Sequence, residues 1–166
     1  MAKTAANVLV GEATLYYHAT AGTVVGSVTT EVGYLEDGVN IEYAPTIEDI
    51  MVEEETVAIK RVITKEDISI TCNMAESDLE QLELALAGSS RAGDIITLGG
   101  GALQDFAIKI VGTAPNGATR TIYAGYVHPT GTVGMSYRKG VKTIVPVTLK
   151  PYLNASGGTV ITWTDA

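Results

Sequence analysis

The stretch 55–88, ETVAIKRVITKEDISITCNMAESDLEQLELALAG, constrains the fold more than any other part of the chain. Apolar and polar residues alternate over 68–74, which is the period-two pattern of a strand with one buried and one wet face. The run 57–63 alternates less cleanly, and the polar segment 64–67 between the two runs is typical of a hairpin loop. The stretch therefore predicts two antiparallel strands followed directly by a helix.

The predicted helix has the strongest local signals in the chain. Ser77 and Glu80 have the S-x-x-E spacing of a capping box, in which each side chain accepts from a backbone N–H that lacks a helical partner. Gly88 stands where a left-handed C-terminal cap is expected. The apolar stripe that should face the core consists of three leucines with the spacing i, i+3 and i+7: Leu79, Leu82 and Leu86.

The remaining sequence predicts short strands separated by glycine-rich turns. Asp37-Gly38 and Asn116-Gly117 are turn signals because these residues accept positive φ, and 88–101 resembles a loop in composition. The segment 45–54 is compatible with a long exposed hairpin arm or with a bent strand. Pro146 cannot donate to a ladder, so its strand should lie at an edge or a bulge. The further strands are expected at 7–17, 29–35, 39–45, 106–110, 119–127, 132–138, 141–150 and 159–163.

Nine or ten strands and one helix predict a mainly β fold, an antiparallel β-sandwich or barrel with one flanking α-helix. The 166 residues suit a single domain, 1–166, although this length would also accommodate two small ones. No apolar run approaches the roughly 20 residues that cross a bilayer. The start of the chain lacks the apolar core of a secretion signal, so we expect synthesis in the cytoplasm. The one cysteine, Cys72, falls on the apolar face of a strand and should be a buried, inert thiol.

Charge is distributed unevenly along the chain, whose formal net charge is −8. Ten acidic residues and no lysine or arginine lie between residues 4 and 59, whereas six cationic residues follow Phe106 and face one acid, Asp165. Two interpretations stay open. The split is either a chance pattern on an acidic surface or a means by which acidic and basic ends meet on neighbouring copies.

No pattern in the chain indicates an active site. His18 and His128 stand apart and have no nearby cluster of acids and cysteines with metal-ligand spacing. There is no G-x-S-x-G, and the glycines at 99–101 do not continue into a phosphate-binding motif. The acidic balance would repel phosphate. We therefore expect a protein that is not an enzyme, has no metal or other cofactor, and acts by contacting copies of itself or a partner.

The order of elements around 55–88 resembles that of the tail tube proteins of bacteriophages. The resemblance rests on the acidic approach VEEE, the hairpin VAIKRVITKEDISI and the strand-to-helix junction TCNMAESDLEQLELALAG, and it extends to the length and the β-richness of the whole chain. It implies the phage tail tube fold and a structural virion protein that self-assembles into hexameric rings. In such rings each subunit contributes strands to a closed inner β-barrel, and the rings stack into the hollow tail through which DNA is ejected. The tube proteins of contractile injection systems share this fold.

The resemblance also implies a location and partners. It places the protein in the virion tail, with no membrane segment. The implied partners are further copies of the chain, a tape-measure protein, and tail-terminator or baseplate proteins. DNA would pass through the tube transiently and without sequence specificity.

Two sets of candidate residues follow from this expectation. A polar, acidic lumen would keep DNA from sticking as it slides. The candidates for facing the lumen are Glu53, Glu55, Ser69, Thr71 and Asn73. The candidates for contacts between rings or subunits are Glu42, Glu48, Asp49, Lys139 and Lys142.

An alternative from another functional class is a monomeric or trimeric binding module, such as a capsid decoration protein or a carbohydrate-binding β-sandwich. Such a module should display a cluster of exposed aromatic residues, which the eight tyrosines and Trp163 could supply. A hexamer or polymer in solution would favour the tail tube, and a stable monomer would favour the binding module.

Overall fold

The computed structural model describes residues 12–53, 56–75, 78–154 and 158–166. Within these residues the chain is mainly β and contains one α-helix, as the sequence predicted. The helical segments are α1 (Leu79–Ala85) and the short 3-10 helix η2 (Val25–Ser27). The strands are β1 (Thr14–His18), β2 (Thr30–Glu31), β3 (Leu35–Ile50), β4 (Lys60–Met74), β5 (Ser89–Ala92), β6 (Ile95–Leu98), β7 (Phe106–Thr113), β8 (Thr119–Thr130), β9 (Val145–Pro151) and β10 (Thr162–Asp165).

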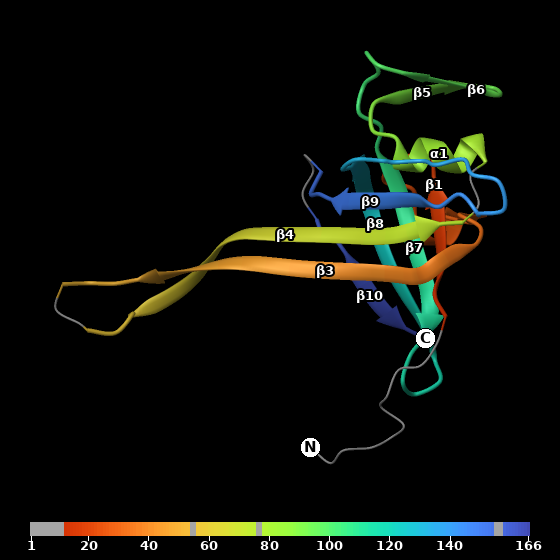
Figure 1. Cartoon of the computed structure of the whole chain (residues 1–166). Coiled ribbons are helices and arrows are strands. Elements are labelled where there is room, and N and C mark those ends of the chain that lie inside the picture. The colour runs from red at the N-terminus through yellow and green to blue at the C-terminus, as the bar shows by residue number, and fades with distance from the viewer. Residues whose placement is uncertain (1–11, 54–55, 76–77, 155–157) are drawn as a thin grey trace.

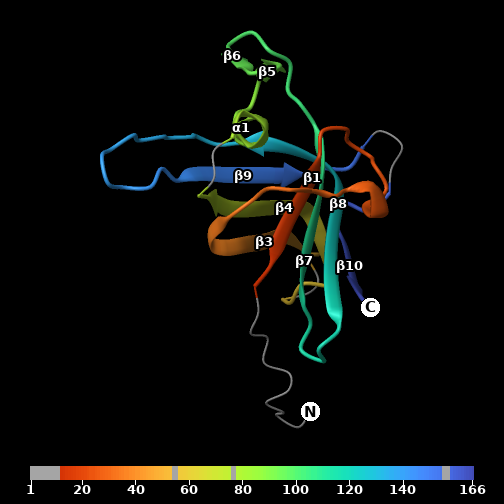
Figure 2. The ribbon, with the colours of Figure 1, turned by 90° about the vertical axis from the view of Figure 1, so that its right-hand side faces the viewer.

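Eight of the strands form one antiparallel sheet. Seven of them follow the order β2-β1-β7-β8-β9-β4-β3, and the eighth, β10, pairs with β8. Strand β8 changes partner along its length, since residues 120–123 pair with β10 and residues 127–130 pair with β9. The sheet consequently bends into two layers whose strands cross. Strands β1, β7, β8 and β10 form one layer, and β9, β4 and β3 form the other (Figure 1; Figure 2).

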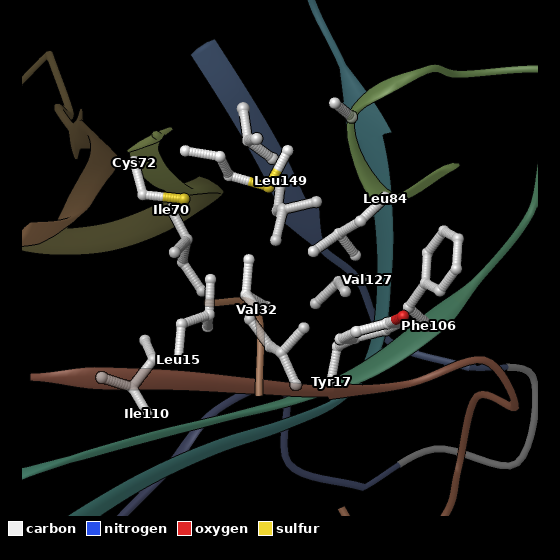
Figure 3. Close-up of a cluster of buried hydrophobic side chains, with 14 of the residues drawn as sticks. Leu15, Tyr17, Val32, Ile70, Cys72, Leu84, Phe106, Ile110, Val127 and Leu149 are labelled. Carbon is white, nitrogen blue, oxygen red and sulfur yellow. The ribbon is translucent and has the colours of Figure 1, made fainter. Parts of the chain in front are cut away.

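The hydrophobic core lies between the two layers. Leu15 and Ile110 enter it from one layer, Ile70 and Leu149 from the other, and Leu84 from α1 (Figure 3). Each of these side chains is nearly or fully buried. Burying one such aliphatic side chain stabilises a fold by about 1.5–3 kcal/mol. The alternation predicted over 68–74 is what directs one side of β4 into this core.

Helix α1 packs across β8 and β9 at one end of the layers (Figure 1). The predicted leucines Leu79, Leu82 and Leu86 all contact the core, but only Leu82 is buried, and the other two are partly buried. Leu84 and Ala85 are buried more deeply and were not predicted. The reason is that the helix has only seven residues and is covered by the β5–β6 hairpin as well as by the main sheet, so its apolar face is wider than one stripe.

The predicted capping box differs from the observed N-terminus of α1. The N-cap is Asp78, whose Oδ1 accepts the Leu79 N–H at 2.7 Å. Ser77, the predicted cap, lies outside the described residues. Gly88 follows the helix with a φ of 69°, so the predicted left-handed conformation is confirmed.

Two of the predicted hairpin turns are wrong. Residues 64–67 lie inside the continuous strand β4. Asp37 and Gly38 lie inside β3, where their φ angles of 63° and 73° accompany a shift of register between Glu36 and Val39. Positive φ is needed by bulges as well as by turns, so the same residue types serve both. The turn at Asn116-Gly117 is confirmed, since the Gly117 N–H donates to Ala114 O at 2.9 Å.

Three further segments can be compared with the predicted loops and strands. Part of the predicted loop 88–101 forms the β5–β6 hairpin. Residues 131–144, which include the strand expected at 132–138, form a loop in which Arg138 and Val141 make an isolated bridge. Pro146 lies on a part of β9 that pairs with β4 and not with β8, so its missing donor is tolerated at a locally free edge, as expected.

Candidate functional site: a projecting arm and a polar sheet face

Strands β3 and β4 leave the body of the molecule together as a long two-stranded arm (Figure 1). We use "the arm" for residues 43–68, of which 54–55 are not described. Pairing continues from Tyr43 opposite Ile68 to Ile50 opposite Lys60, and the Ile59 N–H donates to Ile50 O at 3.0 Å. Of the two interpretations of 45–54, the exposed hairpin arm is the one observed. The arm requires residues 64–67 to be part of a strand and not a turn.

One side of the arm is apolar and uncovered. Ile41 and Ile70 are opposite each other on the core side of the sheet, and the same side continues outward through Tyr43 and then Ile47 opposite Ile63. Tyr43 is 53% exposed, and Ile47 and Ile63 are each 56% exposed. The stripe of core-facing residues therefore extends beyond the core itself. Sequence analysis missed it, although the alternation of Ile41, Tyr43 and Ile47 was visible in the sequence.

Two polar pairs lie on the same side of the arm and interrupt the apolar stripe, because Glu66 is opposite Pro45 and Arg61 is opposite Asp49. The Tyr43 Oη donates to Glu66 Oε1 at 2.6 Å, which raises the pKa of Tyr43. Further out, the Arg61 Nε lies 2.8 Å from Asp49 Oδ1. Beyond this ion pair the tip carries more exposed apolar side chains: Ile50, Met51, Val52, Val57 and Ile59.

The opposite side of β4 is polar. Ser69, Thr71 and Asn73, predicted to face a lumen, share this side and point away from the core, and each is partly exposed. Their neighbours on β3 are polar as well: Glu42 is opposite Ser69 and Asn40 is opposite Thr71. Strand β9 adds Thr148 beside Thr71 and also Lys150, which is bonded to Asp67 at 2.8 Å. We call this surface of β3, β4 and β9 the polar face.

The other predicted site residues are placed elsewhere. Glu53 is exposed at the arm tip, away from the polar face, and Glu55 lies outside the described residues. Among the predicted contact residues, Asp49 is paired with Arg61, and the Lys142 Nζ lies 2.8 Å from Glu36 Oε1 of the same chain. The remaining three are exposed, with Glu42 and Glu48 on β3 and Lys139 in the loop 131–144.

The sandwich is open along the margin next to β3. Among the described residues β3 pairs with β4 alone, so its outer edge is unpaired over a strand of 16 residues. A hollow of about 310 Å³ opens between Ile41 of β3 and the other layer, where Ile110, Ile122 and Trp163 line it. The structure thus leaves both a backbone edge and part of the apolar interior accessible.

The described residues contain no group of three or more His, Cys, Asp and Glu side chains that could hold a metal ion. His18 is engaged locally, since its Nδ1 accepts the Thr20 N–H at 3.0 Å. Burial raises the pKa of the Cys72 thiol to about 11, as suits the buried, inert thiol that was predicted.

Comparison with known proteins leaves the family open. No protein-family model matches the chain, and a search of curated proteins finds no significant match. Among the described residues, no helix is both long enough and apolar enough to span a membrane. The fold and its surfaces define the class: a mainly β, antiparallel protein with one α-helix in its described part and an uncovered apolar arm.

Proposed function

We propose that this chain is a structural subunit that assembles with its own copies into stacked rings, the hollow tail tube of a bacteriophage through which DNA passes. The observation that carries the proposal is the uncovered apolar stripe of the arm. The six-fold symmetry, the virion location and the accessory tail proteins rest on the sequence resemblance. In this role the protein has no catalytic function.

The arm is hard to explain in an isolated monomer. A two-stranded ribbon is marginally stable in water by itself, and large apolar side chains that gather on an exposed surface often mark an interaction site. Tyr43, Ile47 and Ile63 are about half exposed, so covering each of them on a neighbouring copy would contribute roughly half of the 1.5–3 kcal/mol of a full burial, about 1 kcal/mol. Self-association therefore supplies the cover that the chain itself lacks.

The unpaired edge of β3 supports ring closure. A long free edge is a template for pairing with another strand, and closing a sheet across subunits removes such edges. The hollow beside Ile41 and Trp163 would be covered by the same neighbour. A closed ring would thus complete both the hydrogen bonding of β3 and the open margin of the core.

The polar face is suited to a water-filled bore. Ser69, Thr71 and Asn73 are short and uncharged, and Glu42 beside them adds negative charge. The cation on the adjacent strand, Lys150, is neutralised by Asp67. A surface of this kind offers DNA phosphates little attraction, so the duplex would slide without being held.

Sedimentation velocity and electron microscopy of the purified chain test this proposal. We expect rings or tubes with a central hole. Ile47→Asp should leave the thermal melt close to that of the wild type, because the side chain is exposed in the monomer, but should abolish assembly. Thr46→Asp, on the opposite side of the same strand, is the matched control and should still assemble. A wild-type chain that stays monomeric at high concentration would overturn the proposal and favour the binding module.

A further inference from the structure

The start of β3 borders two adjoining hollows that the body of the molecule leaves open. One measures about 720 Å³ and the other about 310 Å³, and Glu12, Ala13 and Val39 line both of them. We call their combined surface the trough. Ile41 and Trp163 line its apolar part, which is the smaller hollow. The trough is therefore a concave surface at the open margin of the core.

The trough carries uncompensated negative charge. Glu12, Glu31 and Asp37 line it and are exposed. These three carboxylates have no ion-pair partner among the described residues. The cation that lines the smaller hollow, Arg120, does not neutralise them, because its Nε is bonded to Asp165 Oδ1 at 2.7 Å. The trough thus combines apolar area with free negative charge.

The loop 131–144, which joins β8 to β9, has the opposite charge. It contains three cations and no acid. Lys142 is paired with Glu36, whereas Arg138 and Lys139 have no ion-pair partner in the part of the chain that the structure describes. The loop therefore offers two free cations to another molecule.

The same loop exposes large apolar side chains. Tyr137 is 77% exposed, and Met135 and Val141 are exposed as well. The Val141 N–H donates to Arg138 O at 3.3 Å, and the two residues form an isolated bridge. This turn holds Tyr137 beside the free cations. The loop is therefore a shaped projection with apolar and basic side chains, complementary to the trough.

The loop and the trough lie at the same end of the strands but beyond opposite borders of one layer. Strands β9, β4 and β3 are neighbours in that order, and in Figure 1 the loop passes above β9 whereas β3 is the lowest of the three. The Lys142 Nζ lies 2.8 Å from Glu36 Oε1, so the loop is close to the start of β3, the end away from the arm. The trough is at this end too, because Leu35 and Val39 line it.

A neighbouring copy displaced across the strands, and not along them, would bring its loop to the trough of the first copy. Such a contact joins different surfaces of two copies, so it repeats from copy to copy and forms a ring if the rotation closes. The arm extends along the strands from the opposite end and takes no part in it (Figure 1). The two surfaces are therefore placed as those of neighbours within one ring.

We propose that the loop 131–144 of one copy docks in the trough of the next copy within a ring. The free cations of the loop lie against the acidic residues of the trough, and Tyr137 covers the apolar part beside Trp163. Complementary charge orients two such surfaces and suppresses wrong partners. The contact also covers apolar side chains, so it does not depend on charge alone. This inference rests on the proposed function and names the surfaces that meet within a ring.

Charge reversal tests the pairing by sedimentation velocity. The trough variant carries Glu12→Lys and Glu31→Lys, and the loop variant carries Arg138→Glu and Lys139→Glu. Each should raise the concentration at which half of the protein is in rings by about a hundredfold or more, because like charges now face each other. An equal mixture of the two variants should form rings at the wild-type concentration, because each contact in an alternating ring joins opposite charges. Recovery in the mixture also shows that both variants are folded.

Asp94→Lys is the control for a charge change at an exposed site, since Asp94 lies in the turn between β5 and β6. It should leave ring formation unchanged. Rings from the trough variant alone or from the loop variant alone, at the wild-type concentration, would overturn the docking. Two monomeric variants whose mixture does not assemble would equally overturn it. A wild-type chain that stays monomeric would instead refute the proposed function, and this inference with it.

The fluorescence of Trp163 tests whether the trough is covered. Trp163 is the one tryptophan of the chain and is 56% exposed in the single copy. Because the docked loop covers it, its emission should shift to shorter wavelength in wild-type rings, and acrylamide should quench it less than in the monomeric loop variant. Equal quenching in the rings and in the monomeric variant would refute the docking.

Cross-linking tests the contact without changing any charge. Thr14→Cys in the trough and Ser136→Cys in the loop are nearly isosteric, and Cys72 is too buried to compete. A short bis-maleimide should join the doubly substituted chain into covalent multimers up to the closed ring, and each single substitution should give none. Dimers from Ser136→Cys alone would mean that loops meet loops and would refute the docking. Rings of the doubly substituted chain that yield no covalent multimer refute the docking but leave the tube standing.

Discussion

Asp37 and Gly38 bend β3 where it passes the core. Glu36 and Val39 pair with consecutive residues of β4, so the two residues between them have no partner on that strand. Both adopt positive φ angles. A bulge at this place increases the twist of the strand. Single residues thus help to set the direction in which β3 leaves the body.

The positive φ of Gly38 predicts that a larger residue at this position destabilises the fold. A Cβ at Gly38 would meet no atom within 4 Å, so the cost of Gly38→Ala is that of the backbone conformation alone. We expect a loss of about 1–2 kcal/mol in the free energy of unfolding measured with urea. Gly26→Ala also meets nothing within 4 Å, and Gly26 does not have positive φ. It should cost much less, and equal losses in the two variants would show that strain at Gly38 is not the cause.

The reactivity of the Cys72 thiol should depend on folding. Burial raises its pKa from 9.0 to about 11, so folding favours the neutral thiol. Its contribution to stability is present below about pH 9 and is lost as the pH rises toward about 11. At pH 8 a thiol reagent should therefore react about a hundredfold more slowly with the native protein than with the urea-unfolded chain. Rapid stoichiometric labelling of the native protein would show that the thiol is accessible.

Among the secondary-structure elements, α1 is short and depends on tertiary contacts. Seven residues are too few for a helix to be stable in water without packing. Asp78 caps its first turn, and Leu82, Leu84 and Ala85 bury its inner side against the sheet. The helix in turn closes one end of the core, so helix and sandwich stabilise each other.

This dependence predicts that Leu82→Asp abolishes soluble folded protein, because the change places an unpaired charge in the core. The milder Leu82→Ala should lower the free energy of unfolding by about 2–5 kcal/mol. Ala87→Asp, at an exposed position after the helix, should leave the circular-dichroism melt close to that of the wild type. A normal melt from Leu82→Asp would remove the helix from the core.

The whole molecule has a compact body and an arm that leaves it. Both layers and α1 contribute residues to the core. In contrast, every residue of β3 after Ile41 is exposed. The core is therefore mostly buried within one chain, whereas the arm and the open margin beside β3 are left uncovered. This difference between a buried core and an uncovered arm and margin is the basis of the assembly that we propose.

The uneven charge of the chain, acidic over residues 4–59 and basic after Phe106, predicts that assembly depends on salt. Raising the salt from about 50 mM to 1 M shortens the Debye length from more than 10 Å to about 3 Å and weakens exposed ion pairs. Tubes observed by electron microscopy should become shorter, and rings should accumulate. Tubes of unchanged length over this range would mean that stacking is not electrostatic.

Elements with a purely local pattern can be read from the amino-acid sequence. The alternation over 68–74, the left-handed Gly88, the turn at Asn116-Gly117 and the buried Cys72 all follow from residue type and spacing, and each was predicted correctly. The same patterns sufficed for the fold class, a mainly β antiparallel protein with one flanking helix.

Where the strands end and which apolar residues stay uncovered depends on long-range contacts. The polar segment 64–67 resembles a turn, yet it continues as a strand because β3 pairs with it out to Ile50. Ile41 and Ile47 belong to the same apolar alternation, but Ile41 lies against the core and Ile47 lies beyond its margin. Burial depends on how far the opposite layer extends, which is a property of distant parts of the chain. The apolar arm therefore became visible only in three dimensions.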